Sequence, residues 1–373
     1  MKKIFAPVGL LLTLSACGDP SAVVTPAQQL TSRLQAVAAS GKILYGHEDA
    51  LMYGHAWTPA EAPGTGFDRS DVKDVCGSHP AVLGLDLGGI ERNDACNLDG
   101  LDFNNIRAAA VAHAARGGIV TFSWHARNPL TGGDAWDVSS AEVVSSILEG
   151  GEKHELFLTW LDRAADFLAS LKDGNGALVP VIFRPWHEHT GSWFWWGKKL
   201  CSVEEYTALW RMTHDRLVSE RGLTNIVWAY SPGGGSDEAE YMERYPGDDI
   251  ADVLGVDIYQ YTAPGEDLAS SGRRLAEQVG DALGFMERLG REHDKVIALT
   301  ETGLEGIPDP TWWTKVLLPA VEAYPVAYVL TWRNAWDRPT HFYGPFPGAA
   351  CEEDFRAFAG SGKIVMLSEE KEK

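Results

Sequence analysis

Two glutamates each follow an apolar segment that has the composition of a buried strand. Glu188 lies just beyond residues 178–183, and the aromatic residues 193–196 follow it closely. Glu301 ends a second apolar segment, which begins at Val296. A carboxylic acid beside apolar rings suits the protonation of a glycosidic oxygen, because the rings desolvate the acid and also stack on sugar faces. The two glutamates therefore predict a sugar-cleaving site.

The two carboxyl groups are expected to differ in charge. Trp193 and its neighbours should desolvate Glu188 and raise its pKa, whereas hydrogen-bond donors such as Tyr259 should keep Glu301 ionised. A retaining glycosidase holds its two carboxyl groups about 5–5.5 Å apart, and an inverting one roughly 6.5–9.5 Å apart. The residues alone leave both spacings open.

Short apolar segments alternate with amphipathic ones along most of the chain. The amphipathic segments, which carry apolar residues at helical spacing, are 102–116, 152–172, 203–221, 268–289 and 311–324. The apolar segments, which predict strands buried on both faces, are 43–46, 82–87, 119–124, 178–183, 226–230, 253–259, 296–300 and 326–332. Eight such units predict an α/β fold with a single (β/α)8 TIM barrel over residues 41–360.

A barrel of this kind carries its chemistry just past the carboxyl ends of its strands. Polar and aromatic residues gather at these positions, and nothing comparable gathers at the strand starts. They are His47, Glu48, Asp86, Glu91, Trp124, His125, His187, Glu188, Ser231, Asp257, Tyr259, Glu301, Trp332, Arg333 and Asn334. The bias indicates one functional site at the carboxyl-end rim of the barrel.

The first residues have the pattern of a secretory signal, with two lysines before an apolar run at 4–14. Residues 14–18 resemble a lipobox, which predicts a signal peptide at 1–17, lipidation of Cys17 and anchoring in the outer membrane of a bacterial cell envelope. Ordinary signal cleavage beside an incidental cysteine is the alternative, and the membrane face stays open. Residues 18–40 are expected to form a tether and a helix that Thr25 caps, and 361–373 a tail.

Composition and charge narrow the classes of molecule that the chain is expected to bind. The formal net charge of −20 argues against nucleic acid and against an anionic membrane surface, and suits a neutral polysaccharide. Neither a metal nor a cofactor is expected. In particular, His187 and Glu188 do not begin a zinc-protease helix, because position 191 is glycine. Four further cysteines, an even number in an oxidising compartment, predict disulfides with three possible connectivities: Cys76, Cys96, Cys201 and Cys351.

Several short motifs carry a resemblance to one family. They are GHED at 46–49, SWH at 123–125, RPWHEHTGSWFWWG at 184–197, YPGDD at 245–249, VDIYQ at 256–260, TETG at 300–303, TWRNA at 331–335 and HFY at 341–343. In this order they resemble glycoside hydrolase family 26, a family of retaining β-mannanases. The resemblance runs from about residue 43 to about 348.

The resemblance implies Glu188 as general acid/base and Glu301 as nucleophile. It also implies roles for a set of neighbours: His187 bonding the nucleophile or the reacting sugar, Tyr259 donating to Glu301, His125 binding sugar hydroxyls, Trp193 stacking under the leaving sugar, Arg333 holding a sugar on the non-reducing side, and Asp257 and Trp332 at the rim. Two plainer readings stay open. His125 could be a structural histidine, and Arg333 could merely neutralise a rim aspartate.

The expected reaction is hydrolysis of β-1,4-mannosidic bonds in mannan and manno-oligosaccharides by double displacement. The polar segment 88–100 could wall off the non-reducing end, which favours an exo mode with release of mannobiose; it could also be an ordinary connector. The alternatives are random endo cleavage, hydrolysis of β-1,3-xylan or mixed-linkage glucan, and a lipoprotein that binds glycans without cutting them. A pure binder would need neither Glu188 nor Glu301.

Overall fold

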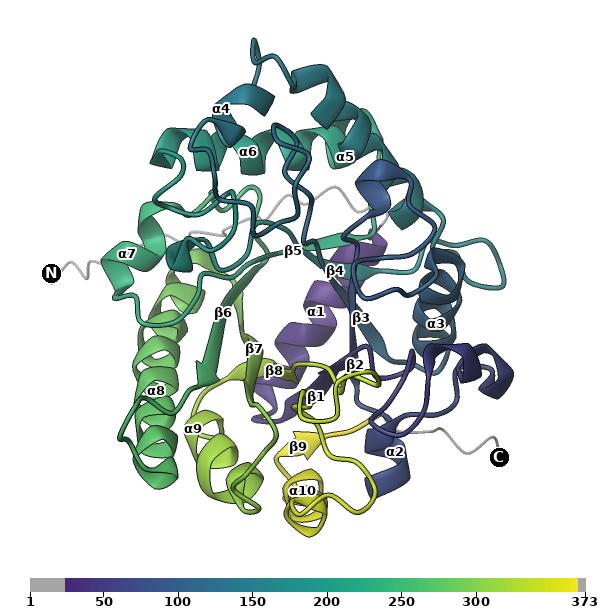
Figure 1. Ribbon diagram of the computed structural model, residues 1–373, viewed down its shortest axis with the longest axis vertical. Helices are drawn as coiled ribbons and strands as arrows, with labels where there is room; N and C mark the ends of the chain where they lie inside the picture. The colour runs from purple at the N-terminus through teal and green to yellow at the C-terminus, as the bar shows by residue number, and fades with distance from the viewer. Residues whose placement is uncertain (1–23, 368–373) are drawn as a thin grey trace, which may run out of the picture.

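The computed structural model describes residues 24–367, and its strands form a closed parallel barrel (Figure 1). The strands are β1 (Ile43–Glu48), β2 (Val82–Asp86), β3 (Ile119–Ser123), β4 (Val181–Arg184), β5 (Ile226–Tyr230), β6 (Val253–Gln260), β7 (Val296–Leu304) and β8 (Val326–Thr331). Each pairs with the next in sequence, and β1 pairs with both β2 and β8, which closes the ring. The predicted (β/α)8 barrel is confirmed.

Helices follow the strands and surround the barrel (Figure 1). They are α2 (Asp71–Cys76), α3 (Phe103–Ala115), α4 (Val143–Ile147), α5 (His154–Ala169), α6 (Val203–Asp215), α7 (Glu238–Glu243), α8 (Leu268–His293), α9 (Leu318–Val321) and α10 (Glu352–Ala359). Two π-helical turns, η5 (Arg216–Glu220) and η6 (Trp313–Leu317), follow α6 and precede α9. Shorter 3-10 turns are η1 (Pro59–Glu61), η2 (Pro63–Thr65), η3 (Ile90–Arg92) and η4 (His189–Gly191). All five predicted helical segments contain helix.

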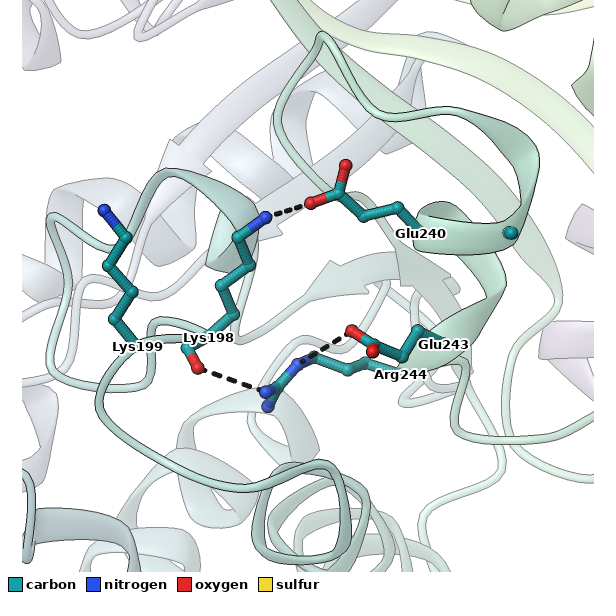
Figure 2. A pocket seen from close by; sticks show the side chains of 6 residues that line it. Lys198, Lys199, Glu240, Glu243 and Arg244 are labelled. Atoms are coloured by element: carbon teal, nitrogen blue, oxygen red, sulfur yellow. Dashed lines mark hydrogen bonds and ion pairs between the residues drawn. The ribbon is translucent and has the colours of Figure 1, made fainter.

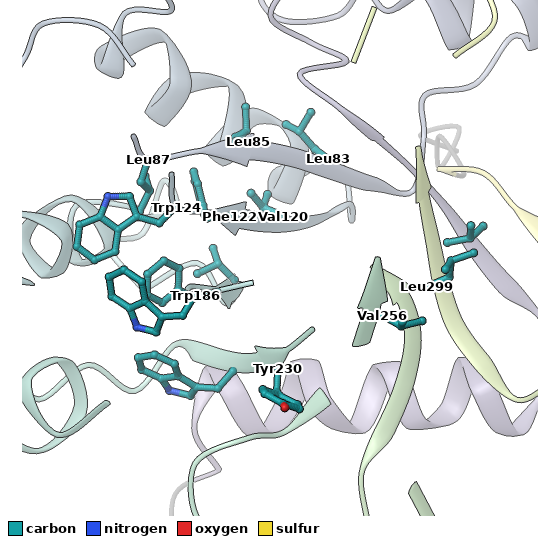
Figure 3. Close-up of a cluster of buried hydrophobic side chains, with 14 of the residues drawn as sticks. Leu83, Leu85, Leu87, Val120, Phe122, Trp124, Trp186, Tyr230, Val256 and Leu299 are labelled. Atoms are coloured by element: carbon teal, nitrogen blue, oxygen red, sulfur yellow. The ribbon is translucent and has the colours of Figure 1, made fainter. Parts of the chain in front are cut away.

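Strand alternation divides the core into two layers. Leu83 and Leu85 of β2 point outward and belong to the larger apolar cluster, which also holds Trp124 and Trp186 beyond the strand ends (Figure 3). Val82, one residue before Leu83 and therefore on the opposite face of β2, belongs to a second cluster formed by the inward-facing strand residues. Side chains on opposite faces of every strand are thus buried, which explains why the strands have continuous apolar sequences.

The helix α1 (Pro26–Ala39) belongs to the barrel and is more than part of a tether. Thr25 accepts a hydrogen bond from the Gln28 backbone N–H at 3.2 Å, and the Gln28 side chain accepts from the Thr25 N–H, so the predicted cap is present. Leu30 and Leu34 are buried in the inward-facing cluster. In Figure 1 this helix is seen through the ring of strands. Residues 24–40 therefore belong to the catalytic-domain fold.

The pairing of β6 with β7 is irregular at the site. The register shifts between Val256 and Asp257, so Asp257 lies opposite Glu301 and Tyr259 opposite Gly303. An irregularity of this kind re-aims the side chains that follow it. It brings a carboxylate of β6 and the predicted nucleophile of β7 to the same level of the barrel mouth.

Two expectations need correction. The predicted tail contains a short strand, β9 (Ile364–Val365), which pairs in parallel with β1, so residues up to 367 extend the sheet. The four cysteines predicted to form disulfides are all free thiols. Cys201, for example, is buried and directs its sulfur to the backbone oxygens of Trp196 and Gly197 at 3.6 Å. The predicted signal peptide and Cys17 lie outside the described residues.

Candidate active site

The turn after β4 holds Glu188 in a conformation that the backbone rarely adopts. Trp186, Glu188 and Ser192 all have positive φ, with 53° at Glu188, a left-handed region that non-glycine residues seldom occupy. The Glu188 backbone N–H donates to the Ser231 carbonyl at the end of β5, at 2.8 Å. Such strain is retained where the surrounding structure fixes a functional side chain. Here it fixes the direction of the predicted acid.

Trp193 completes the surroundings of Glu188. Its indole N–H donates to Glu188 Oε2 at 2.8 Å, and its ring lies where a side chain on Gly191 would clash. The Trp193 side chain is 45% exposed, so one face of the ring remains open to a ligand. Burial, followed by the negative charges of Glu301 and Asp257, raises the pKa of Glu188 well above its usual value. Glu188 is thus suited to the predicted role of proton donor.

Glu301 has the opposite kind of environment. Its Oε1 accepts a hydrogen bond from Arg184 Nη2, and its Oε2 accepts one from the Tyr259 hydroxyl at 2.6 Å. Burial, followed by the charges of Glu301 and Glu188, raises the pKa of Tyr259, so this phenol keeps its proton and donates it. The Tyr259 contact is the one assigned to it from the sequence. Two donors aimed at one carboxylate fix the orientation of the predicted nucleophile.

Arg184 bridges Glu301 to Asp257. Its Nη1 donates to Asp257 Oδ2 at 2.8 Å and to Ser231 Oγ at 3.1 Å. Thr300 Oγ1 donates to Asp257 Oδ1 at 2.6 Å. Asp257, predicted as a rim carboxylate in contact with the other site residues, is buried and forms an ion pair with this arginine. It acts on the site through Arg184 and Glu301.

Two histidines form a second polar chain. His125 Nδ1 lies 2.7 Å from Asp86 Oδ2, and His125 Nε2 lies 3.3 Å from His187 Nε2. Burial opposes protonation of His125, but the charge and hydrogen bond of Asp86 outweigh it, and the pKa of His125 is raised. Burial, followed by the charges of Arg184 and His125, lowers the pKa of His187. The raised pKa of His125 and the lowered pKa of His187 favour His125 as the donor in this pair.

His187 does not pair with the predicted nucleophile. Within residues 24–367, no hydrogen bond joins His187 to Glu301, whose two oxygens are held by Arg184 and Tyr259. The backbone oxygen of His187 accepts from the Trp196 indole at 2.8 Å. Of the two roles predicted for His187, contact with the reacting sugar is the one that stays open.

A third cluster lies at the opposite side of the mouth. Arg333, after β8, forms an ion pair with Asp99 at 2.9 Å and donates to the Tyr53 hydroxyl at 3.1 Å. The Tyr53 hydroxyl in turn donates to Asp49 Oδ2 at 2.5 Å. Asp99 belongs to the segment 88–100 after β2, so Arg333 neutralises an aspartate, as one reading of the sequence proposed. The same ion pair fastens that segment to the barrel.

Aromatic side chains line the mouth between these clusters. Trp332 is partly buried, and its ring centroid lies 6.1 Å from that of His125. Trp136, which the sequence analysis did not single out, lies nearly parallel to His125 with centroids 5.2 Å apart and is 46% exposed. Trp136 belongs to an irregular segment without strand or helix periodicity. The sequence feature that could have pointed to Trp136 is its isolation among glycines and aspartates.

A separate surface pocket of about 580 Å³ is not the place of the chemistry (Figure 2). Lys198, Glu240 and Arg244 are among the residues that line it, and Lys198 forms an ion pair with Glu240. Both of its carboxylates face cations, whereas the barrel mouth holds an acid with a raised pKa beside an arginine-bound carboxylate. Among residues 24–367, no group of three or more His, Cys, Asp and Glu side chains is arranged to hold a metal ion.

Comparisons with known proteins agree on one family. The family model "Glycosyl hydrolase family 26" matches residues 23–286, which include Glu188 and end before Glu301. A mannan endo-1,4-beta-mannosidase of Bifidobacterium adolescentis is 34% identical over 86% of this chain, which spans 33% of that protein's length. A mannan endo-1,4-beta-mannosidase of Bacillus subtilis is 28% identical over 71% of this chain and 69% of that protein.

Solved structures give the same picture over more of the chain. A glycoside hydrolase family 26 β-mannanase from Bacteroides ovatus is 50% identical, with a TM-score of 0.86 over 92% of this chain and 95% of the other. A Cellulomonas fimi endo-β-1,4-mannanase is 34% identical, with a TM-score of 0.81 over 93% of this chain and 76% of the other. These likenesses extend through nearly all of the described barrel.

Replacing Trp193 by Phe should move the alkaline limit of activity to higher pH. The indole N–H stabilises the ionised form of Glu188, so removing it raises the pKa of Glu188 further, while the remaining ring keeps the acid desolvated. An acid must be protonated to act, so kcat/KM falls as pH rises through that pKa. The measurement is the pH profile of kcat/KM on a manno-oligosaccharide, with Trp336→Phe as the control. An unchanged or lowered alkaline limit would contradict this assignment.

Proposed function

We propose, from the premise that this chain belongs to glycosyl hydrolase family 26, that it hydrolyses β-1,4-mannosidic bonds in mannan and manno-oligosaccharides with retention of configuration. One observation carries the proposal: two glutamates share the barrel mouth in opposite environments. Glu301 is held by Arg184 and Tyr259, and Glu188 is desolvated next to Trp193. Curated relatives bear the name mannan endo-1,4-beta-mannosidase, which supports mannan as the substrate.

The first step forms a mannosyl ester. Glu301 attacks the anomeric carbon while Glu188 gives its proton to the glycosidic oxygen, and the carbon–oxygen bond to the leaving sugar breaks. As Glu301 loses its negative charge, Arg184 remains paired with Asp257, so the guanidinium keeps a partner throughout. The leaving sugar takes the proton that Glu188 carried.

The second step restores the enzyme. Glu188, now a carboxylate, accepts a proton from water, and the water oxygen attacks the anomeric carbon as the ester bond to Glu301 breaks. The released Glu301 carboxylate is received by the Tyr259 hydroxyl and by Arg184. His125, His187 and Trp332 lie beside this site and are proposed to contact the sugar at the cleavage point. No cofactor enters either step.

Azide should distinguish the roles of the two glutamates. Glu188→Ala should lower kcat/KM on mannohexaose by about 10²–10⁴-fold, the usual contribution of an acid/base group. With an activated aryl mannobioside and azide, this variant should recover turnover and release a β-azide. Glu301→Ala should instead give an α-azide, because azide then attacks the substrate directly. Products are assigned by NMR. Full activity of either variant without azide would refute its role, and unchanged mannan binding with no wild-type turnover would favour a pure binder.

We infer further that the enzyme acts on chain ends and releases mannobiose. The segment 88–100 is tied to the mouth by the ion pair of Asp99 with Arg333. Asn97 organises it internally, since its side-chain oxygen accepts from the backbone N–H groups of Asp99 and Leu101, each at 3.0 Å. A segment braced in this way supports a wall beyond the sugar that Arg333 is proposed to hold. The relatives named as endo-acting keep random endo cleavage as the alternative outcome.

Loosening this segment should change the products. Wild-type enzyme should release mannobiose as nearly the sole early product from mannohexaose and barely reduce the viscosity of a soluble mannan. Asp99→Ala removes the ion pair with Arg333 and should yield longer products and a faster viscosity drop. Asp94→Ala is the matched control, because Asp94 lies in the same segment and approaches arginines only at 3.9–4.0 Å. A wild-type enzyme that gives mixed products at once would make it an endo-mannanase.

We propose that Cys17 carries a lipid that anchors the mature chain in the bacterial cell envelope. The support is the signal-like N-terminus and the lipobox-like residues 14–18. Among the described residues, no helix is both long and apolar enough to cross a bilayer. The face of the membrane is left to experiment.

Cys17→Ser should release the protein from the membrane fraction. Because the proposed anchor is attached to this sulfur, the wild-type chain should incorporate labelled fatty acid and sediment with membranes, whereas the variant should do neither. Cys96→Ser, which alters an exposed thiol of the barrel domain, is the control. Equal membrane association of wild-type protein and Cys17→Ser would exclude the anchor.

A further inference from the structure

Tyr261 is an exposed aromatic residue that the reaction described above does not use. It follows β6, two residues beyond Tyr259, and 68% of its surface is exposed. Its ring centroid lies 6.2 Å from that of Tyr259, with the planes inclined by 40°. An aromatic side chain that is left largely in water beside a catalytic site offers an apolar face to a ligand.

The position of Tyr261 relative to the two glutamates places it at the mouth. Burial is the main influence that raises the pKa of Tyr261, followed by the charges of Glu188 and Glu301. Tyr261 also directly follows Gln260, the last residue of β6, at the same strand end as Tyr259. The contact with Tyr259, which itself bonds Glu301, agrees with that placement.

The backbone beneath Tyr261 is braced. Arg274 of α8 donates from Nη2 to the Tyr261 carbonyl oxygen at 2.5 Å. Both carboxylate oxygens of Glu266 accept from Arg274, at 3.1 Å and 2.7 Å, and hold the guanidinium in place. Asp267 then caps α8 by accepting from the Ser270 backbone N–H at 2.7 Å. The ring is presented from a fixed segment, as a stacking surface requires.

The barrel topology assigns Tyr261 to one side of the cleft. In a closed ring of eight strands, β6 lies opposite β2, because four steps separate them in either direction. The segment 88–100, which is proposed to wall off the non-reducing side, follows β2. Tyr261 therefore lies across the mouth from that wall, on the side where the leaving sugars must exit.

We propose that Tyr261 is a stacking platform for a mannose unit of the leaving group. Trp193, which bonds the acid Glu188, is the nearer platform, and Tyr261 serves the leaving oligosaccharide from the β6 side. The assignment rests on the proposed function. Tyr261 is then a specificity-determining residue. Through it, the enzyme prefers leaving groups made of sugars to leaving groups that place no sugar on this side.

The test compares two substrates whose leaving groups differ. Tyr261→Ala should lower kcat/KM on mannohexaose by about 3–10-fold, as expected for loss of an aromatic contact. It should affect hydrolysis of a nitrophenyl β-mannobioside much less, because nitrophenol puts no sugar on the leaving side. Tyr261→Phe should restore activity on mannohexaose, since the ring and not the hydroxyl makes the contact. The Tyr261→Ala variant should also transfer less mannose to added mannotetraose.

Each outcome of this comparison either supports or overturns the assignment of Tyr261. Equal losses on both substrates would show that Tyr261 supports the fold of the site, and no loss on mannohexaose would show that the ring binds no leaving sugar; both overturn the assignment. Failure of Tyr261→Phe to restore activity would overturn the stacking role. Wild-type turnover of both substrates separates this test from the proposed function, because an inactive wild type would refute that function first.

Discussion

The buried guanidinium of Arg184 is the interaction on which the site depends. It lies inside the barrel at the end of β4 and is shared by Glu301 of β7 and Asp257 of β6. A buried charge is tolerated only with close partners, and removing one partner of such a pair typically costs about 3–5 kcal/mol. The irregular register that sets Asp257 opposite Glu301 supplies both partners at once. Three strands are thereby locked to one another at the mouth.

This arrangement gives two residues of the same type opposite environments. Glu301 receives donors from Arg184 and Tyr259, whereas Glu188 receives a single neutral donor from Trp193 and faces two negative neighbours. The strained turn from Trp186 to Ser192 holds Glu188 in that environment. The proton donation proposed for Glu188 and the nucleophilic attack proposed for Glu301 therefore follow from environment and not from residue type.

Much of this could be predicted because it depends on local pattern. Continuous apolar segments marked the eight strands, Thr25 with Pro26 marked the start of α1, and the barrel rule led to Glu188 and Glu301. The rest depends on spatial relations that no local pattern encodes. Arg184 ends an apolar strand, and only the shifted register of β6 reveals its second partner. The two-residue β9 has no periodicity, and the even number of cysteines suggested disulfides although all four are free.

The central claim is that Glu301 forms a covalent bond to the sugar. In a 2-deoxy-2-fluoro-β-mannosyl fluoride, the 2-fluorine slows both formation and breakdown of the ester, while the fluoride leaving group speeds formation alone. The intermediate should therefore accumulate and be visible by mass spectrometry of the intact protein. The account predicts one added fluoromannosyl group, located by peptide mapping on Glu301. A label on another carboxylate would contradict the assignment of the nucleophile. No label, together with release of the α-anomer from a natural substrate, would replace double displacement by direct attack of water.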